Sequence, residues 1–313
     1  MSSANLVALR FIQESVLGTT PANPALTSLR FLSESLNYAI QNTVSEEIRS
    51  DRAQTDTVPV SAEAAGDINF ELSFATFDAW LQALLGGTWG AVSGNIQALT
   101  NGTTVRSFTV QKDFSDLISG RYHTFRGVIP NKMTLGFEIG QIVKGSFGCL
   151  AMSAAMADAQ ISGATFVAAP TNTPMNAVSN FQAFMVDSVP YSGCISALSL
   201  EINNNFRAIR CLGNLASSDM KSGTLEITGS MDLYFNEGSL YSKFLAGQEF
   251  DFSFRMMDAA GNNYTFYVPR AKFETGEVVA GGLNTDVMLR TTWRALYDGT
   301  AGHVIRIVKD PIG

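Results

Sequence analysis

The sequence predicts a mainly β (α+β) protein with two tandem domains, each a β-sandwich or rolled sheet with one flanking α-helix. Three observations support this fold class: period-two alternation of apolar and polar residues recurs, only two segments have helical periodicity, and one order of elements occurs twice. The alternation is clearest in residues 66–74, 197–202 and 249–254 and weaker in residues 303–308. Strands with one buried and one solvated face have this pattern.

Two segments predict amphipathic helices. Residues 77–85 place apolar side chains at i, i+3, i+4, i+7 and i+8, and the Gly86–Gly87 pair that follows is a typical helix stop. Residues 239–246 have a similar apolar face and are followed by Gly247. We expect both helices to pack against a sheet.

One order of elements is found in both halves: a strand, a long loop, a second strand, a helix and two further strands. The matching strands contain Ser35, Gly66, Phe108 and Pro130 in the first half and Ser199, Gly223, Phe252 and Pro269 in the second half. The offset between matching positions falls from 164 to 139 residues, as expected if insertions and deletions are confined to loops. The sequence therefore predicts a tandem duplication.

The expected organisation has four parts. Residues 1–30 form an extended N-terminal arm, residues 31–157 the first domain, residues 158–193 a linker and residues 194–313 the second domain. The linker is rich in Ala, Ser, Thr and Asn, and three prolines interrupt any regular element within it.

Composition favours an oligomer and disfavours nucleic-acid recognition. Only 16% of the 313 residues are charged, against roughly 25% in an ordinary soluble domain, so much uncharged surface is available for contacts. The net charge is −7, and no cluster of Lys and Arg is present to neutralise phosphates.

We expect neither a signal peptide nor a transmembrane helix. The first residues lack the basic and apolar regions of a signal peptide, and no apolar run reaches the roughly 18 residues of a membrane helix. The three cysteines, Cys149, Cys194 and Cys211, are widely spaced. We interpret them as buried free thiols in a chain made in the cytoplasm.

No motif predicts catalysis. The two histidines, His123 and His303, lie far apart in the sequence, so neither a metal cluster nor a His-based triad is expected. The chain lacks phosphate-binding, dinucleotide-binding and nucleophile-elbow motifs. We expect no catalytic residue, no cofactor and no metal. An enzyme would need a site that the sequence does not reveal.

One segment is dense in charge. Residues 46–56 carry six charged side chains: Glu46, Glu47, Arg49, Asp51, Arg52 and Asp56. The segment is either a solvated loop or a docking loop whose arginines bind carboxylates of a neighbouring subunit.

The segments 12–36, 46–56 and 66–89 together resemble the tail tube proteins of long-tailed bacteriophages, most closely the major tail proteins of non-contractile, siphophage-type tails. The most specific features are the charged 46–56 loop, the start of the strand at Gly66, and four residues of the arm. These four residues are Glu14, Gly18, Thr19 and Pro21. The resemblance covers about the first 100 residues, and the remainder matches only in strand order.

The resemblance implies tail-tube-like domains that assemble into stacked rings around a hollow channel. In such tubes six domains per ring each lend four strands to a continuous inner β-barrel. With two tube domains per chain, three chains form a pseudo-sixfold ring; if the second half is a decoration, six chains are needed. The six charged residues of the 46–56 loop would then bridge subunits or rings, and the four arm residues would make further contacts.

The resemblance also implies a location and partners. The chain would belong to the virion tail and be assembled in the host cytoplasm. It would bind other copies of itself, a tape measure protein, a tail terminator and distal tail proteins. Genomic DNA would pass without specific binding, and no membrane would be involved. Contractile tails contain similar tube subunits inside a sheath.

Barrel geometry fits such a channel. With strands about 4.8 Å apart and tilted by about 40°, 24 strands give a backbone diameter of roughly 48 Å and a pore of roughly 35–40 Å.

The alternative function belongs to a different class. The chain would be a duplicated β-sandwich that acts as a binding module, like an adhesin or a capsid-decorating protein, and does not polymerise. Self-assembly into stacked rings distinguishes the two.

Overall fold

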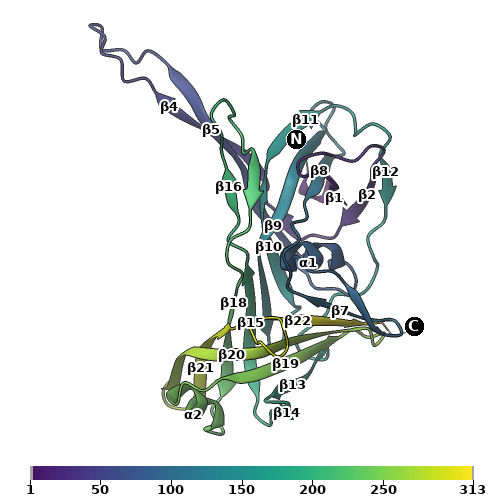
Figure 1. Cartoon of the computed structure of the whole chain (residues 1–313), viewed down its shortest axis with the longest axis vertical. Coiled ribbons are helices and arrows are strands. Elements are labelled where there is room, and N and C mark those ends of the chain that lie inside the picture. Colours follow the sequence, from purple (N-terminus) through teal and green to yellow (C-terminus); the bar gives the residue numbers. More distant parts are fainter. Residues whose placement is uncertain (1–2, 312–313) are drawn as a thin grey trace.

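The computed structural model describes residues 3–311 and is mainly antiparallel β-structure, with two short helices (Figure 1). The first-half elements are η1 (Ala4–Leu6), β1 (Val7–Gln13), β2 (Ala25–Leu29), β3 (Ser33–Glu34), β4 (Asn37–Val44), β5 (Thr57–Glu71), α1 (Asp78–Leu85), β6 (Gly90–Ser93), β7 (Ile96–Thr100), β8 (Phe108–Phe114), β9 (Tyr122–Glu138), β10 (Lys144–Ala151), β11 (Ser153–Ala157) and β12 (Thr165–Val167). The second-half elements are β13 (Phe181–Val186), β14 (Val189–Pro190), β15 (Ile195–Asn203), β16 (Arg207–Ile209), β17 (Asp219–Lys221), β18 (Glu226–Tyr234), α2 (Ser239–Leu245), β19 (Phe250–Met257), β20 (Asn263–Ala280), β21 (Val287–Ala295) and β22 (Arg306–Asp310).

Eight strands form one antiparallel sheet that we call the spine. Its strand order is β4–β5–β10–β9–β15–β18–β21–β20, with β3 extending the β4 edge. The first four strands come from the first half of the chain and the last four from the second half. The pairing of β9 with β15 joins the halves.

Outside the spine, each half carries a second layer with the same strand order. The layers are β1–β8–β9–β11 and β13–β19–β20–β22. Strands β9 and β20 are 17 and 18 residues long. Their N-terminal parts belong to these layers and their C-terminal parts to the spine. In both halves the helix follows the second spine strand, so the halves match in element order and in pairing.

The buried faces of the spine and the second layers form one apolar core that spans both halves. In the first half the ring of Trp80 stacks on Phe108 at 4.8 Å and lies 5.3 Å from Phe147. In the second half Trp293 makes an edge contact with Phe252 at 4.8 Å. Burial of such large rings supplies most of the driving force for folding.

Both predicted helices are confirmed to within one residue. Helix α1 buries Trp80, Leu81, Leu84 and Leu85, and ends at Gly86, which has φ of +64°. Glycine adopts this left-handed conformation without steric cost. Helix α2 buries Leu240 alone among its seven residues, and it lies against β20.

Two segments of the expected N-terminal arm, residues 1–30, form strands; residues 1–2 lie outside the described residues. Strand β1 pairs with both β2 and β8, and Leu9 and Phe11 are buried in the core. The apolar residues of β1 alternate, but the run is short and is followed by a Gly- and Pro-containing stretch that is typical of loops. The pairing with β8, distant in sequence, stabilises it as a strand.

The expected linker, residues 158–193, is also partly structured. Strand β12 pairs in parallel with β2, and β13 pairs with β19. The ring of Phe181 stacks on Phe254 at 5.7 Å. Strands that pair with each half therefore reach into this segment, and residues 168–180 lie between them.

A polar cluster around Asp78 connects the two halves. The Tyr264 hydroxyl donates to the carboxylate of Asp78, accepts from the amide of Ala75 at 2.9 Å, and Lys309 Nζ lies 2.7 Å from Asp78 Oδ2. Burial, and then the charge of Asp78, raise the pKa of Tyr264 well above its ordinary value. The cluster ties the start of α1 to β20 and β22.

Substitution of Tyr264 by Phe tests this connection. The change leaves the Ala75 amide and one Asp78 oxygen without their partner, so we expect a loss of about 1–3 kcal/mol in the free energy of unfolding. Urea denaturation of the unassembled chain measures it. Tyr297→Phe is the control, because the Tyr297 side chain is 58% exposed. Equal stability of the two variants would contradict the role of the cluster.

Candidate assembly surfaces and channel lining

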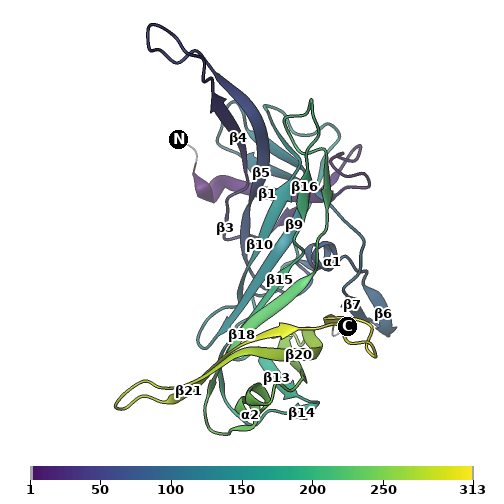
Figure 2. The same ribbon diagram turned by 60° about the vertical axis from the view of Figure 1, so that its left-hand side comes forward.

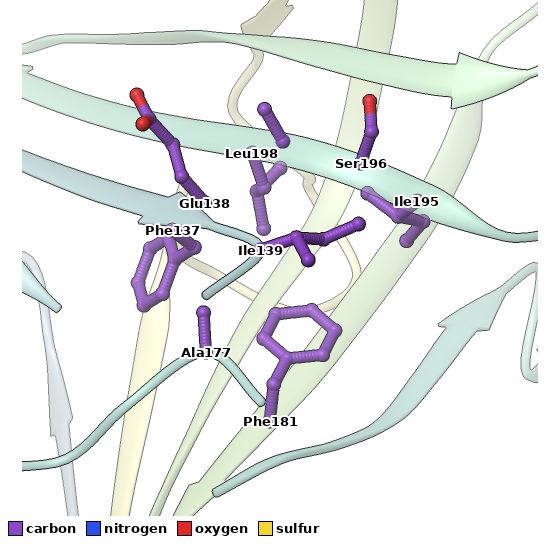
Figure 3. Close-up of a pocket in the computed structure, with 9 residues that line it drawn as sticks. Phe137, Glu138, Ile139, Ala177, Phe181, Ile195, Ser196 and Leu198 are labelled. Atoms are coloured by element: carbon purple, nitrogen blue, oxygen red, sulfur yellow. The ribbon is translucent and has the colours of Figure 1, made fainter. Parts of the chain in front are cut away.

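The cleft in Figure 3 lies where the end of β9, the start of β15 and residues 177–181 meet. Its lining is mainly apolar and includes Phe137 and Phe181. The carboxylate of Glu138 and the hydroxyl of Ser196 point to the opposite side of the strands from these two rings. The cleft therefore offers packing surface and no arrangement of a nucleophile with a base.

The residues with potential for metal or nucleophile chemistry are dispersed. His123 lies in β9 against the ring of Phe114 at 4.9 Å, and His303 lies in the turn before β22. Within residues 3–311 no group of three His, Cys, Asp or Glu side chains is arranged to hold a metal. No helix in that range is long and apolar enough to cross a membrane.

The cysteines differ in exposure. Cys149 is buried on β10, and burial, followed by the nearby charge of Asp67, raises the pKa of its thiol. A thiol with a raised pKa is a poor nucleophile. Cys194 and Cys211 are exposed, so the expectation of three buried thiols is wrong for these two, which lie at the start of β15 and after β16.

The solvent-facing side of the spine is polar along its whole width, and we call it the polar face. Alternation places Ile68, Phe70 and their counterparts in the core, while Asp67, Asn69 and Glu71 point the other way. The register carries this division across all eight strands because paired residues point to the same face.

The polar face carries both signs of charge. Its charged residues are Glu63, Asp67, Glu71, Lys132, Glu138, Lys144, Glu201, Glu226, Asp232, Lys272, Glu274, Glu277, Arg290 and Arg294. Nine are acidic and five are basic, so the face carries a formal charge of −4. The basic groups are interspersed with acidic ones rather than clustered.

Cross-strand bonds neutralise part of this charge. Lys132 Nζ lies 2.8 Å from Glu201 Oε1 across the junction between the halves, and Arg294 bonds Glu274. The hydroxyls of Ser199 and Ser230 are 2.8 Å apart. Polar side chains on this face thus bond to one another across neighbouring strands.

The charged segment 46–56 forms the tip of the hairpin β4–β5, which projects from the body (Figures 1 and 2). Its six charged residues, Glu46, Glu47, Arg49, Asp51, Arg52 and Asp56, are all exposed. The Arg49 guanidinium donates to both carboxylate oxygens of Asp51, at 3.0 and 2.6 Å. This hydrogen bonding lowers the pKa of Asp51. Local bonds therefore order the tip, but its outward charges remain available.

One side of this hairpin is apolar. It continues the core side of β5 beyond the buried Ala62 and consists of Tyr38, Ile40, Val58 and Val60. The side chains of Ile40, Val58 and Val60 are 50%, 50% and 56% exposed. An exposed apolar stripe on a projecting ribbon is typical of a contact surface.

Glu14 is the best-connected of the predicted arm residues. Its buried carboxylate accepts bonds from the hydroxyls of Ser107 and Thr109 at 2.6 and 2.8 Å, and from the amides of Gly18 and Gly127 at 2.8 and 2.9 Å. These contacts lie within the chain and fix the turn after β1.

The other arm residues lie in that turn. Gly18 has φ of +75°, Thr19 donates its amide to the Val16 carbonyl at 3.0 Å and is exposed, and Pro21 is partly exposed. The turn and the 46–56 loop lie on separate elements. Contacts of either with another subunit stay a prediction.

Both ends of the spine have an unpaired edge. Within the described residues, β3 and β4 pair only with β5, and residues 272–280 of β20 pair only with β21. Such edges present free N–H and C=O groups that favour pairing with another chain. Sequence reasoning missed these edges and the polar face, although the alternation in residues 66–74 and 197–202 identifies part of the face.

Residues 4–295 match the family model described as phage tail tube protein. A search of curated proteins gives no match. Because the matched segment spans nearly the whole chain, this protein belongs to the phage tail tube protein family.

Proposed function

We propose that this chain polymerises as stacked rings of three copies and forms the hollow tail tube of a siphophage-type phage. Genomic DNA would pass through the tube into the host. The observation that carries the proposal is the spine: eight antiparallel strands, four from each half, with an unpaired edge at each end. A sheet of this kind loses its unpaired edges when copies close into a ring.

The trimer follows from a tandem duplication. The two halves share the order of their spine strands, the place of the helix and the order of their second layers. If each half acts as one tube domain, three chains supply 24 strands. A barrel of 24 strands has a backbone diameter of roughly 48 Å and a pore of roughly 35–40 Å. Such a pore is wide enough for duplex DNA.

The polar face would line the pore. Its formal charge of −4 per chain becomes about −12 for three copies, without a cationic patch that would hold phosphates. DNA would therefore slide along a hydrated polar surface. The apolar face of the same strands is already buried in the core.

The projecting elements would connect subunits and rings. We assign this role to the loop residues Glu46, Glu47, Arg49, Asp51, Arg52 and Asp56, and to the turn with Gly18, Thr19 and Pro21, which Glu14 holds in place. In the tail, the ends of the tube would meet the tape measure, terminator and distal tail proteins. Assembly would take place in the host cytoplasm.

Electron microscopy of the purified chain at rising concentration tests the ring proposal. We expect hollow tubes with stacked rings, each of about 101 kDa, three times the chain mass of 33.7 kDa. Rings of twice that mass would contradict the trimer. A chain that forms only monomers or single closed oligomers, with and without a phage initiator complex, would favour a non-polymerising binding module.

Charge reversal of Arg49 and Arg52 to Glu tests the loop. Because both side chains are exposed at the hairpin tip, we expect an unchanged melting temperature but loss of tube growth through repulsion from acidic partners. Arg255→Glu is the control, because Arg255 is an exposed residue of β19. Light scattering measures growth, and tubes of normal length from the double variant would refute the role of the loop.

Reversal of three acidic residues on the polar face tests the channel lining. Glu71→Lys, Glu138→Lys and Asp232→Lys change its formal charge from −4 to +2 per chain. We expect assembled tubes to retain short duplex DNA at about 50 mM salt and to release it as salt rises. The matched control has Gln, Gln and Asn at these positions. Equal retention by wild type and both variants would contradict the assignment.

A further inference from the structure

We propose that the buried ion pair of Glu34 with Lys112 caps the free β3–β4 edge of the spine and thereby controls when another strand can add there. This inference rests on the proposed assembly and concerns its control. Lys112 Nζ lies 2.6 Å from Glu34 Oε2, and the side chains of Lys112 and Glu34 are 8% and 13% exposed. Lys112 belongs to β8 of the second layer and Glu34 to β3 at the edge of the spine.

The ion pair occupies two backbone groups of the edge. Glu34 Oε2 accepts from the amide of Leu36 at 3.0 Å, and Lys112 Nζ donates to the carbonyl of Leu36 at 2.6 Å. The amide of the preceding residue, Ser35, donates to the carbonyl of Asp67 in β5 at 2.9 Å. Because successive residues of an edge strand direct their backbone groups to opposite sides, those of Leu36 face the open side of the edge. An added strand would need these two groups, and the ion pair already satisfies both.

The second layers show which residue of the second half corresponds to Lys112. The register shifts at Phe108–Val110 in β8 and at Phe250–Phe252 in β19, so these two shifts align the strands. Lys112 follows the first shift by two residues, and Phe254 follows the second shift by two residues. Lys112 therefore corresponds to Phe254.

Two glycines align the spine strands. Gly66 in β5 and Gly229 in β18 each belong to the row of paired residues just before the register skips one residue of β9 or β20. A Cβ atom on Gly66 would lie 2.4 Å from the carbonyl oxygen of Ser35, and a Cβ atom on Gly229 would lie 2.0 Å from that of Ser199. Ser35 therefore corresponds to Ser199, which is the match that the sequence predicts.

The second half has two apolar residues in place of the ion pair. Glu34 and Leu198 precede these serines and so correspond to each other. Leu198 and Phe254 are 2% and 1% exposed and belong to the apolar core, so the fold does not require charge at this place. The halves differ in what lies beyond the strand: β15, which carries Leu198, pairs with β9, whereas within the described residues β3 pairs only with β5. The ion pair thus occurs in the half whose edge is free.

A charge directed inward is one way in which proteins protect a free strand edge from pairing with other chains. A strand that adds here must displace the Glu34 carboxylate from the Leu36 amide, and a buried charge that loses its partner is costly. The cap would therefore keep single chains from pairing at this edge until the end of a growing tube supplies compensating bonds.

Replacement of the pair by apolar residues, Glu34→Leu with Lys112→Leu, tests the cap. Because apolar replacement of a buried ion pair is often neutral or stabilising, we expect an unchanged or higher melting temperature. The variant should associate at a concentration at least about fivefold lower than the wild type, because its edge is no longer protected. Analytical ultracentrifugation measures the association.

Asp219→Leu with Lys221→Leu is the matched control. It removes an ion pair of β17, whose side chains are 38% and 60% exposed, and adds the same two apolar residues away from the edge. This control should associate at the wild-type concentration. If the leucines at positions 34 and 112 prevent folding, the nearly isosteric Glu34→Gln with Lys112→Met removes both charges and should lower the concentration in the same direction.

Hydrogen exchange of single chains supplies a second measurement. The Leu36 amide should exchange at least about tenfold more slowly in the wild type than in the double-leucine variant, because only the wild type has the Glu34 acceptor. A folded variant that associates at the wild-type concentration, or a Leu36 amide that is unprotected in the wild type, would overturn the cap. Failure of the wild-type chain to form tubes would instead refute the proposed function.

Discussion

The pairing of β9 with β15 is the interaction on which the rest of the structure depends. Without it, each half would have a four-stranded sheet with two edges and an incomplete core. With it, eight strands share one register, and every strand must place its apolar residues on the same side. One face of the spine becomes the core and the other remains polar. Backbone hydrogen bonds, which fix the register, therefore decide which residues pack in the core and which lie on the polar face.

The two long strands allow this spine to coexist with the second layers. Register shifts occur at Gly148–Cys149 opposite β9 and between Phe273 and Thr275 within β20. A bulge at such a point bends and twists the strand, and in both strands it lies near the change from second layer to spine. Each long strand therefore belongs to two sheets, so it connects the polar face of the spine to the core beneath it.

Local signals in the sequence predict much of this fold. The apolar spacing of residues 77–85 and the glycine at position 86 suffice for α1, and alternation suffices for the strands around Ile68 and Leu200. Strands β1 and β13 were not predicted, since they are short, flanked by Gly, Pro or Asn, and stabilised by distant partners. The polar face depends on the register of eight strands. The free edges depend on which pairing partners are absent within the chain. Neither property is encoded in a local pattern.

The covalent connection between the halves also has a kinetic consequence. In the proposed ring, three of six seams form when the chain folds, so only three bodies must meet instead of six. Each association that is avoided saves the cost of lost translational and rotational freedom, and the internal seam forms at the high effective concentration of a tethered pair. Ring closure would therefore depend on a lower power of subunit concentration, and tube growth could proceed while the chain is still scarce in the infected cell.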